Sequence, residues 1–399
     1  MDKIGVGCAS VTDLEKKYVM DALDNQRLSQ GKYVNAFEKK FAAMHNQKYG
    51  VMCNSGTTAL ELALATLAEV GKWEKEDEVL VPAITFIATS NACIHVGLKP
   101  VFVDVDPITY NMNPDEIEKH ITSRTRCIIP VHAFGMPCDM DSIMEIARKH
   151  DLRVLEDCAE SHFAKYKGQP VGGFGDISAF STYVAHTITT GIGGVVCTSD
   201  SLHAEILRSL VAHGRACTCE RCIASDGKTV CPKRMKTDID RRFMFVRLGY
   251  SYRVGEIEGA LGLAQIERVD EIMSKRKDHA LAMNEALADY QELIQLPKCP
   301  DYIEHTYMMY PVVIKEDSGI EYKEMIDYLE TNNIETRPML PLLNQPIYKE
   351  IFGDIEDEYP VAKYIDSHGF YIGCHHEMTE EQIVYVVDTM KGFLNKYKK

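Results

Sequence analysis

The stretch "EVLVPAITFIATSNACIHVGLKPVFVDV", residues 78–105, decides the fold class of this chain. Its two ends, "EVLVPA" and "KPVFVDV", are short apolar runs that are typical of buried strands. The segment between them, "FIATSNACIHVG", has its apolar residues at helical spacing. This order of strand, helix and strand predicts a largely parallel sheet that is covered by helices on both faces.

The same alternation continues on both sides of this stretch. Further strands are predicted at "KYGVMCN", "TRCIIPVHA", "LRVLEDC" and "DISAFSTY", and helices at "TTALELALATLAEV" and "MDSIMEIARKH". We therefore predict an α/β large domain over residues 1–265, with ligands bound beyond the carboxyl ends of the strands. Residues 215–242, "RACTCERCIASDGKTVCPKRMKTDIDRR", lack apolar periodicity and are predicted to be a loop inserted into this domain, called the insert below.

The remaining residues, 266–399, are predicted to form a connector helix and a small C-terminal domain. The connector belongs to a long helical pattern that begins near "YSYRVGEIEGALGLAQ". After it, "HTYMMYPVVI", "KEMIDYLETNN" and "TEEQIVYVVDTMKGFLNKY" predict a small α+β domain.

Composition excludes several classes of protein. The net charge of −15 over 399 residues argues against nucleic acid as a partner. The longest apolar stretch, "TTALELALATLAEV", is interrupted by Glu61 and Glu69 and is too short to cross a membrane. The first ten residues lack the pattern of a secretory signal, and the 13 cysteines then indicate free thiols or metal ligands. We expect a cytoplasmic protein.

Three motifs supply groups that pyridoxal phosphate needs. "CNSGTTALELAL" places Ser55, Gly56 and Thr57 between a strand and a helix, where N–H groups and hydroxyls can hold a phosphate. "RVLEDCAESH" ends a buried strand with Asp157, whose carboxylate can keep the pyridine nitrogen protonated. "VPAITFIATSN" offers Phe86 as an aromatic face for the ring. Taken singly, the motifs are also compatible with an N-cap turn, a capping aspartate and core packing.

Taken together, the motifs resemble the DegT/DnrJ/EryC1/StrS sugar aminotransferase family. The resemblance covers nearly the whole chain and includes "GKYVNAFEKKFA", "VHAFGMPCDMDSIMEIARKHDLRVLEDCAESH", "GGFGDISAFS" and "LGYSYRVGEIEGALGLAQIERVDE". It implies the aspartate aminotransferase fold, also called fold type I, with a mostly parallel seven-stranded sheet in the large domain. It also implies a homodimer whose active sites are shared between subunits.

The resemblance assigns a role to each matching position of the cofactor site. Gly56 and Thr57, next to Ser55, would hold the phosphate together with Ser181. Phe86 would stack on the ring, and Asp157 would meet the ring nitrogen.

Three further positions match the family with a change or with two possible roles. Glu160 stands where the family usually has Gln near the ring hydroxyl. Ser251 replaces the usual Asn that reaches the phosphate in the partner subunit. Arg337 matches an arginine of the small domain, and it could bind the phosphates of the substrate or the carboxylate of an amino donor.

The lysine that anchors pyridoxal phosphate in such enzymes is missing from "FSTYVAHTITTGIGGVV", residues 180–196. By the resemblance, His186 falls on its position, five residues after Ser181. A lysine forms a Schiff base with the cofactor aldehyde, whereas an imidazole forms no stable one. The cofactor must then be held without a covalent bond, and pyridoxamine phosphate becomes its natural resting form. Histidine can still move a proton at neutral pH.

The stretch "YVAHTITTGIGG" resembles the pattern Y-x-A-H-x-I-T-x-G-x-G-G of the nucleotide-4-ketosugar 3-dehydratase branch of the family. That likeness implies loss of the C3 hydroxyl from a nucleotide-linked 4-keto-6-deoxyhexose, with His186 as the proton carrier and glutamate as the amino donor. Two alternatives stay open. One is transamination or another reaction on a ketosugar, and the other is a regulator that binds the ligand without turning it over.

The insert contains a cysteine pattern of its own, C-x-C-x₂-C-x₈-C, formed by Cys217, Cys219, Cys222 and Cys231. Four thiolates can bind zinc or an iron–sulfur cluster, and the spacing does not choose between them. Within the dehydratase branch, one member carries a [2Fe–2S] cluster for deoxygenation, and another carries no cluster. A cluster here would imply an electron-transfer reductase as a partner. The alternative is a reduced loop in which the cysteines are incidental.

Overall fold

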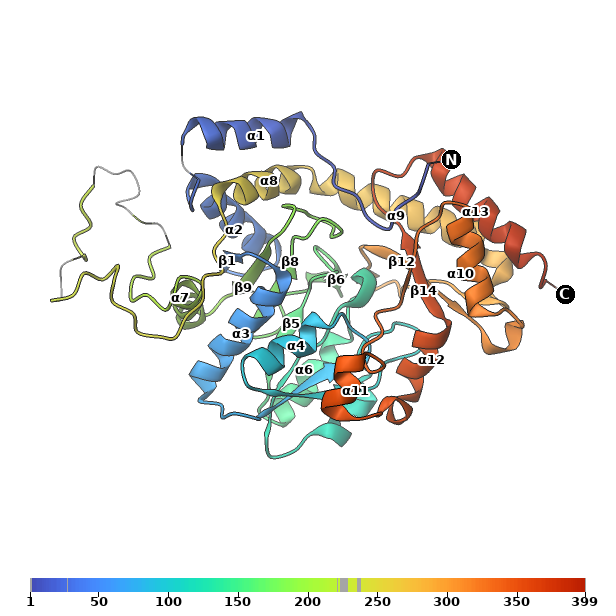
Figure 1. Cartoon of the computed structure of the whole chain (residues 1–399), viewed down its shortest axis with the longest axis horizontal. Helices are drawn as coiled ribbons and strands as arrows, with labels where there is room; N and C mark the ends of the chain where they lie inside the picture. Colours follow the sequence, from blue (N-terminus) through green and yellow to red (C-terminus); the bar gives the residue numbers. More distant parts are fainter. Residues whose placement is uncertain (1, 27, 221, 223–228, 235–237, 399) are drawn as a thin grey trace.

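The computed structural model describes residues 2–26, 28–220, 222, 229–234 and 238–398, and its centre is a seven-stranded sheet (Figure 1). In sheet order the strands are β1 (Tyr49–Cys53), β9 (Gly194–Thr198), β8 (Ile177–Ser181), β5 (Arg153–Asp157), β4 (Thr125–Ile128), β2 (Glu78–Pro82) and β3 (Lys99–Val103). β9 runs antiparallel to both β1 and β8, and the other neighbouring strands run parallel. The predicted α/β class with a mostly parallel seven-stranded sheet is confirmed.

Helices cover both faces of this sheet. They are α2 (Lys32–Met44), α3 (Gly56–Gly71), α4 (Ala88–His95), α5 (Pro114–Ile117), α6 (Met140–Lys149) and α7 (Ser201–Leu210), while α1 (Asp13–Asp24) packs against α8 (Glu256–Glu267) instead. Side chains alternate between the two faces along each strand. In β2, Val79 and Val81 belong to the core cluster that contains Leu64 of α3, whereas Leu80 packs in a second cluster with Ile143 of α6. Burial on both faces explains why these strands are continuous apolar runs.

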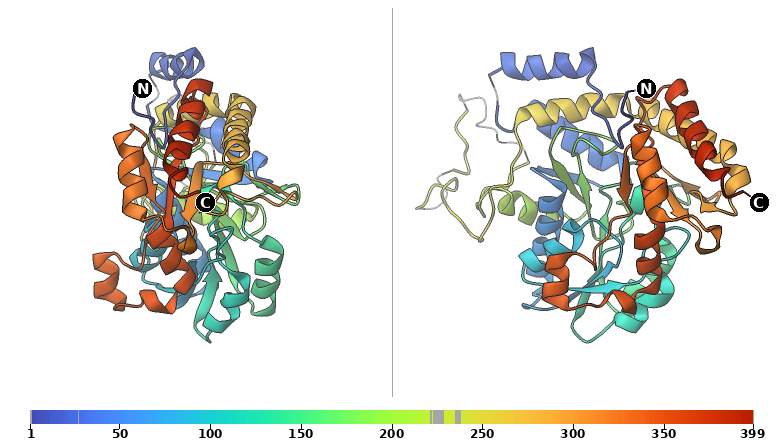
Figure 2. Two further views of the ribbon diagram at one scale, coloured as in Figure 1. Left: turned by 90° about the vertical axis from the view of Figure 1, so that its right-hand side faces the viewer. Right: turned by 45° about the vertical axis from the view of Figure 1, so that its right-hand side comes forward.

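The predicted connector is divided into two helices, α8 (Glu256–Glu267) and α9 (Val269–Ala286). They run from the side of the large sheet to the C-terminal part of the chain (Figure 1 and Figure 2). The break is at Arg268, which has φ −109° and ψ 8°. Its guanidinium lies 3.2 Å from the carboxylate of Glu15. The structure thus resolves the long helical pattern into two helices, and the contact with Glu15 lies where they meet.

The C-terminal part contains a second sheet, as predicted for a small α+β unit. Its strands are β10 (Ile294–Gln295), β12 (Met309–Ile314), β14 (Gly369–Gly373) and β13 (Thr336–Pro338), and its helices are α10 (Tyr322–Thr331) and α13 (Glu380–Leu394). Two more helices, α11 (Pro346–Phe352) and α12 (Pro360–His368), contribute Tyr348 and Ile365 to the core cluster of the large sheet. A three-stranded sheet also joins the two parts, with β11 (Ile303–Glu304), β6 (Lys165–Tyr166) and β7 (Gln169–Pro170). The boundary between residues 265 and 266 stays a prediction.

The insert lies between α7 and α8, and its described residues project beyond α7, away from the large sheet (Figure 1 and Figure 2). Residues 221, 223–228 and 235–237 of the insert lie outside the described residues. Within the part of the chain that the structure describes, no helix has the length and apolar character that a membrane span requires.

Candidate active site

A cavity of about 470 Å³ opens where the carboxyl ends of β1, β5 and β8 meet the start of α3 and the start of β12. This is the place predicted for ligands of a largely parallel sheet. Eight of the predicted site residues line it: Ser55, Gly56, Thr57, Phe86, Asp157, Glu160, Ser181 and His186. The structure thus brings together residues that are spread over more than a hundred positions of the sequence.

One wall of the cavity is suited to a phosphate. The hydroxyl of Ser55 caps α3 and accepts a hydrogen bond from the Thr58 N–H at 3.1 Å. A Cβ atom on Gly56 would lie 2.6 Å from the Cβ of Ser181, so glycine is required for the end of β8 to approach the helix so closely. The N-terminus of α3 and the Ser181 side chain therefore border the same space, and a helix N-terminus favours an anion.

Asp157 places a buried carboxylate in the cavity wall. Its side chain accepts hydrogen bonds from the Thr89 hydroxyl at 2.8 Å and from the Ala159 N–H at 3.1 Å. Burial raises the pKa of Asp157, because the charged form loses its hydration. A carboxylate whose hydrogen-bond donors are neutral is stabilised by any cation that enters the cavity. A protonated pyridine nitrogen fits that requirement.

Phe86 is available to stack on a ring because 61% of its surface is exposed at the cavity. The alternative that Phe86 packs in the core is therefore wrong.

His186 follows β8 in a turn and its half-buried side chain borders the cavity. Its backbone N–H donates to the carbonyl of Tyr183 at 3.0 Å, and its Nδ1 lies 3.3 Å from the sulfur of Met308. Burial, and after it the positive charge of Arg276, lowers the pKa of His186 to about 4. The imidazole is then neutral at pH 7 and can accept a proton. Among the residues that the structure describes, no lysine lines this cavity.

Glu160 lies beside the cavity on the segment that follows β5. Its carboxylate accepts a hydrogen bond from the N–H of Phe134 at 2.6 Å. Burial raises the pKa of Glu160 to about 7. Near neutral pH a large share of the Glu160 side chains therefore carries a proton and can donate a hydrogen bond, as an amide would at this position.

Two predicted site residues do not border the cavity within one chain. Ser251 forms an isolated bridge with Ala212 and lines a different groove of about 870 Å³ with Arg253. Arg337, on β13, is ion-paired with Glu335, and half of its side chain is exposed. Their predicted roles toward the cofactor of a partner subunit and toward substrate stay predictions.

Several residues that line the cavity were not named from the sequence. Thr85 and Thr89 form a hydroxyl pair at 2.8 Å that leads to Asp157. Their spacing of four residues next to Phe86 is a local signal that could have identified them. Met308 and Tyr371 come from the C-terminal part of the chain, and no local pattern marks them.

The four cysteines of the insert border one cavity of about 320 Å³, which Arg234 and Arg241 also line. Among the described residues, however, no three of their sulfurs lie within 4.8 Å of one another as metal ligands would. Burial raises the pKa of Cys217. A bound metal or cluster therefore stays a prediction.

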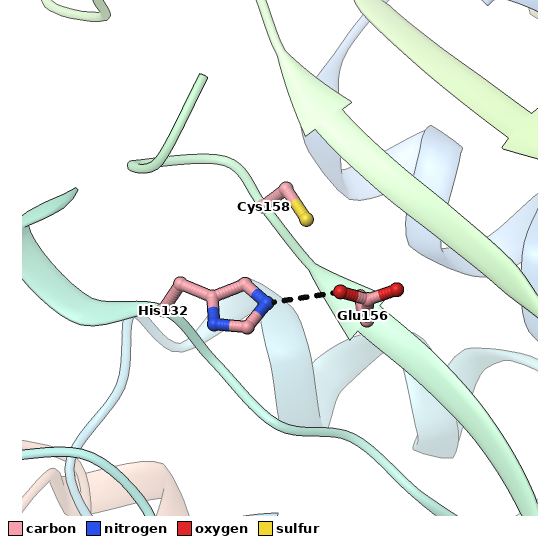
Figure 3. Close-up of side chains that lie close together, drawn as sticks. All are labelled: His132, Glu156 and Cys158. Carbon is pink, nitrogen blue, oxygen red and sulfur yellow. Dashed lines mark hydrogen bonds and ion pairs between the residues drawn. The ribbon is translucent and has the colours of Figure 1, made fainter. Parts of the chain in front are cut away.

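A different group of potential metal ligands, His132, Glu156 and Cys158, lies buried at the end of β5 (Figure 3). The Nδ1 of His132 accepts a hydrogen bond from the Cys138 N–H at 2.9 Å, so the proton is on Nε2, which lies 3.3 Å from Glu156. The Glu156 carboxylate also accepts three backbone N–H groups, from Gly172, Phe174 and Gly175. The His132 and Glu156 atoms that could bind an ion are already engaged, and the group holds the loop after β7 in place.

Known proteins resemble this chain over almost its whole length. The family model described as "DegT/DnrJ/EryC1/StrS aminotransferase family" matches residues 10–391. A GDP-perosamine synthase of Escherichia coli O157:H7 is 34% identical over 98% of this chain and 99% of its own length. A GDP-4-keto-6-deoxy-D-mannose 3-dehydratase of Escherichia coli O55:H7 is 30% identical over 95% of this chain and 97% of its own length.

The fold is shared as well. The structure of the Escherichia coli GDP-4-keto-6-deoxy-D-mannose-3-dehydratase with bound hydrated PLP superimposes with a TM-score of 0.86, at 28% identity, over 98% of this chain and 100% of that one. This match confirms the predicted fold type I architecture. The chain belongs to the DegT/DnrJ/EryC1/StrS aminotransferase family.

Proposed function

We propose that this protein uses pyridoxamine phosphate to remove the C3 hydroxyl of a nucleotide-linked 4-keto-6-deoxyhexose, with His186 as the proton carrier. One observation carries the proposal. A neutral imidazole borders the cavity, and no described lysine does. Among the described residues, the cavity therefore offers no lysine that could form a Schiff base with the cofactor.

The residues of the cavity divide the work of binding and proton transfer. The N-terminus of α3 and Ser181 would hold the cofactor phosphate, Phe86 would cover the ring, and Asp157 would keep the ring nitrogen protonated. When bound, pyridoxamine phosphate supplies an amine that reacts with a ketone and a ring that accepts electrons. His186 would hold and move the proton, because its unprotonated ring is a base at neutral pH.

The substrate class rests on the relatives. Both curated relatives named above carry a GDP-sugar in their names. We therefore propose a nucleotide sugar as substrate, with GDP-4-keto-6-deoxymannose as the first one to test and glutamate as the amino donor. Arg337 would contact the phosphates of the nucleotide after leaving its ion pair with Glu335.

We also propose that the protein is a homodimer. Four apolar side chains lie exposed on the segment between the insert and α8: Phe243, Phe245, Val246 and Leu248, the last of them 99% exposed. Exposed apolar side chains that gather on one segment are typical of an interface. If a second copy of the chain covered this segment, Ser251 of the first copy would lie near the cofactor cavity of the second copy.

The test is product analysis with purified protein, pyridoxal phosphate, glutamate and GDP-4-keto-6-deoxymannose. We expect 2-oxoglutarate and a sugar that has lost its C3 oxygen, identified by mass spectrometry and NMR. A sugar that gains an amine at C4 would show transamination, which the likeness to a GDP-perosamine synthase favours. Binding without turnover of any nucleotide ketosugar would show a regulator instead.

A further inference from the structure

Arg276 of α9 is buried, with 1% of its surface exposed. It binds backbone carbonyls of the segment whose Met308 side chain contacts His186. Its Nη1 donates to the carbonyl of Met308 at 2.9 Å and lies 3.3 Å from the carbonyls of Tyr307 and Cys374. These carbonyls belong to the segments at the start of β12 and the end of β14. The guanidinium therefore fixes the backbone from which the Met308 side chain reaches the cavity.

We propose that Met308 is a positioning residue for His186, held in place by Arg276. The sulfur of Met308 lies 3.3 Å from Nδ1 of the imidazole. Because a thioether has no proton to donate, a hydrogen bond between the two atoms requires the proton on Nδ1. The ring is then held with Nδ1 protonated, and its lone pair is on Nε2. The inference rests on the proposed function, because the orientation matters only if His186 moves a proton at Nε2.

A thioether suits this task for an electrostatic reason. The tautomer of a histidine is set by the hydrogen bond that its other nitrogen makes, and the partner is often a carboxylate. A carboxylate would also stabilise the imidazolium and raise the pKa of the ring. Sulfur is a weak and uncharged acceptor. It can therefore orient the imidazole while leaving it neutral.

The groups whose charge could change the protonation of His186 are Arg276, His162 and the titratable residues of the cavity. Arg276 is buried and forms no ion pair with a carboxylate of the described residues, so its positive charge disfavours a proton on His186. The His162 ring lies 6.2 Å away, and its Nδ1 is 3.3 Å from the N–H of Ile188. Burial, followed by the charge of His186, lowers the pKa of His162.

Four further titratable groups line the same cavity: Asp157, Glu160, Tyr183 and Tyr371. Burial raises the pKa of Asp157, Glu160 and Tyr371. Protonated Glu160 and Tyr371 would not pull a proton onto the imidazole.

The test reads the tautomer directly, by ¹⁵N NMR of protein labelled at histidine, with no cofactor or substrate added. The His186 signals are assigned with His186→Gln. In the wild type we expect the Nδ1-protonated form to dominate. Met308→Leu keeps the volume but removes the acceptor, and we expect the ratio of the two tautomers to change about fivefold, which corresponds to about 1 kcal/mol.

Met309→Leu is the matched control, since Met309 lines the same cavity one residue further along. Arg276→Lys keeps the charge but loses the guanidinium fork, and it should change the tautomer ratio in the same direction as Met308→Leu. If Arg276→Lys fails to fold, Met308→Leu still decides. An unchanged ratio in Met308→Leu, or an equal change in Met309→Leu, overturns the proposal.

These outcomes are separate from those of the product analysis. If the tautomer depends on Met308 but no sugar loses its C3 oxygen, the positioning stands and the proposed reaction fails. If the sugar is dehydrated but the ratio does not depend on Met308, the reaction stands and the positioning fails.

Discussion

Replacing Asp157 with asparagine should change stability and cofactor binding in opposite directions. In the free protein the carboxylate is buried, and its hydrogen-bond donors, the Thr89 hydroxyl and the Ala159 N–H, are neutral. Burial raises the pKa of Asp157 in the folded state. The neutral carboxyl therefore contributes its full stability below the ordinary pKa of about 3.9. That stability is lost as the pH rises through the pKa of the folded state. The amide that replaces the carboxylate carries no charge at any pH. We therefore expect Asp157→Asn to raise the melting temperature of the free protein at pH 7.5, with a difference that shrinks toward pH 4.

The same substitution should weaken cofactor binding. An asparagine side chain cannot offer a negative charge to the protonated ring nitrogen. A hydrogen bond to a charged group contributes about 1.5–3 kcal/mol, which corresponds to a Kd for pyridoxamine phosphate that is about 10- to 150-fold higher. Calorimetric titration measures the Kd, and differential scanning calorimetry measures the melting temperature.

Asp200→Asn is the control for this experiment. Asp200 caps α7, where its side chain accepts the N–H groups of Leu202 and His203, and asparagine caps helices about as well. We expect Asp200→Asn to leave the Kd unchanged. The reasoning is refuted if Asp157→Asn binds pyridoxamine phosphate as tightly as the wild type, or if it lowers the melting temperature of the free protein.

Four shorter predictions follow from other parts of the molecule. His186→Lys should let borohydride fix pyridoxal phosphate to the chain, as detected by intact mass, whereas the wild type should gain no such mass. Elemental analysis should find zinc or iron bound to anaerobically purified protein and lost in Cys219→Ser and in Cys222→Ser; metal retained in both variants would contradict the ligand assignment. Leu248→Asp should convert the dimer to a monomer in light scattering, because it buries a charge in the interface, and a dimeric variant would place the interface elsewhere. Glu160→Gln should leave turnover within a few fold near pH 7 but flatten its decline at higher pH, because ionisation of Glu160 near pH 7 is removed; an unchanged pH profile would show that this carboxyl has no part in it.

The elements that could be predicted from the sequence are those with strong local signals. β2 and β3 are continuous apolar runs, and α3 has a capped start with apolar residues at helical spacing. β9 was not named, because its apolar run is only three residues long, Val195 to Cys197, and directly follows a glycine-rich loop. The break at Arg268 has no local glycine or proline to mark it, and the structure shows a contact with Glu15 there.

The sequence by itself determined the residues whose chemistry is local: the helix start at Ser55–Thr57, the strand-end carboxylate of Asp157 and the imidazole at position 186. Only the tertiary structure decided the environment of these groups. Met308, 122 positions away from His186, supplies the atom next to Nδ1, and Arg276 supplies the charge that helps to keep the ring neutral. The physical reason is that burial, electric field and hydrogen-bond partners depend on which distant segments pack together, and no local pattern of residues records that.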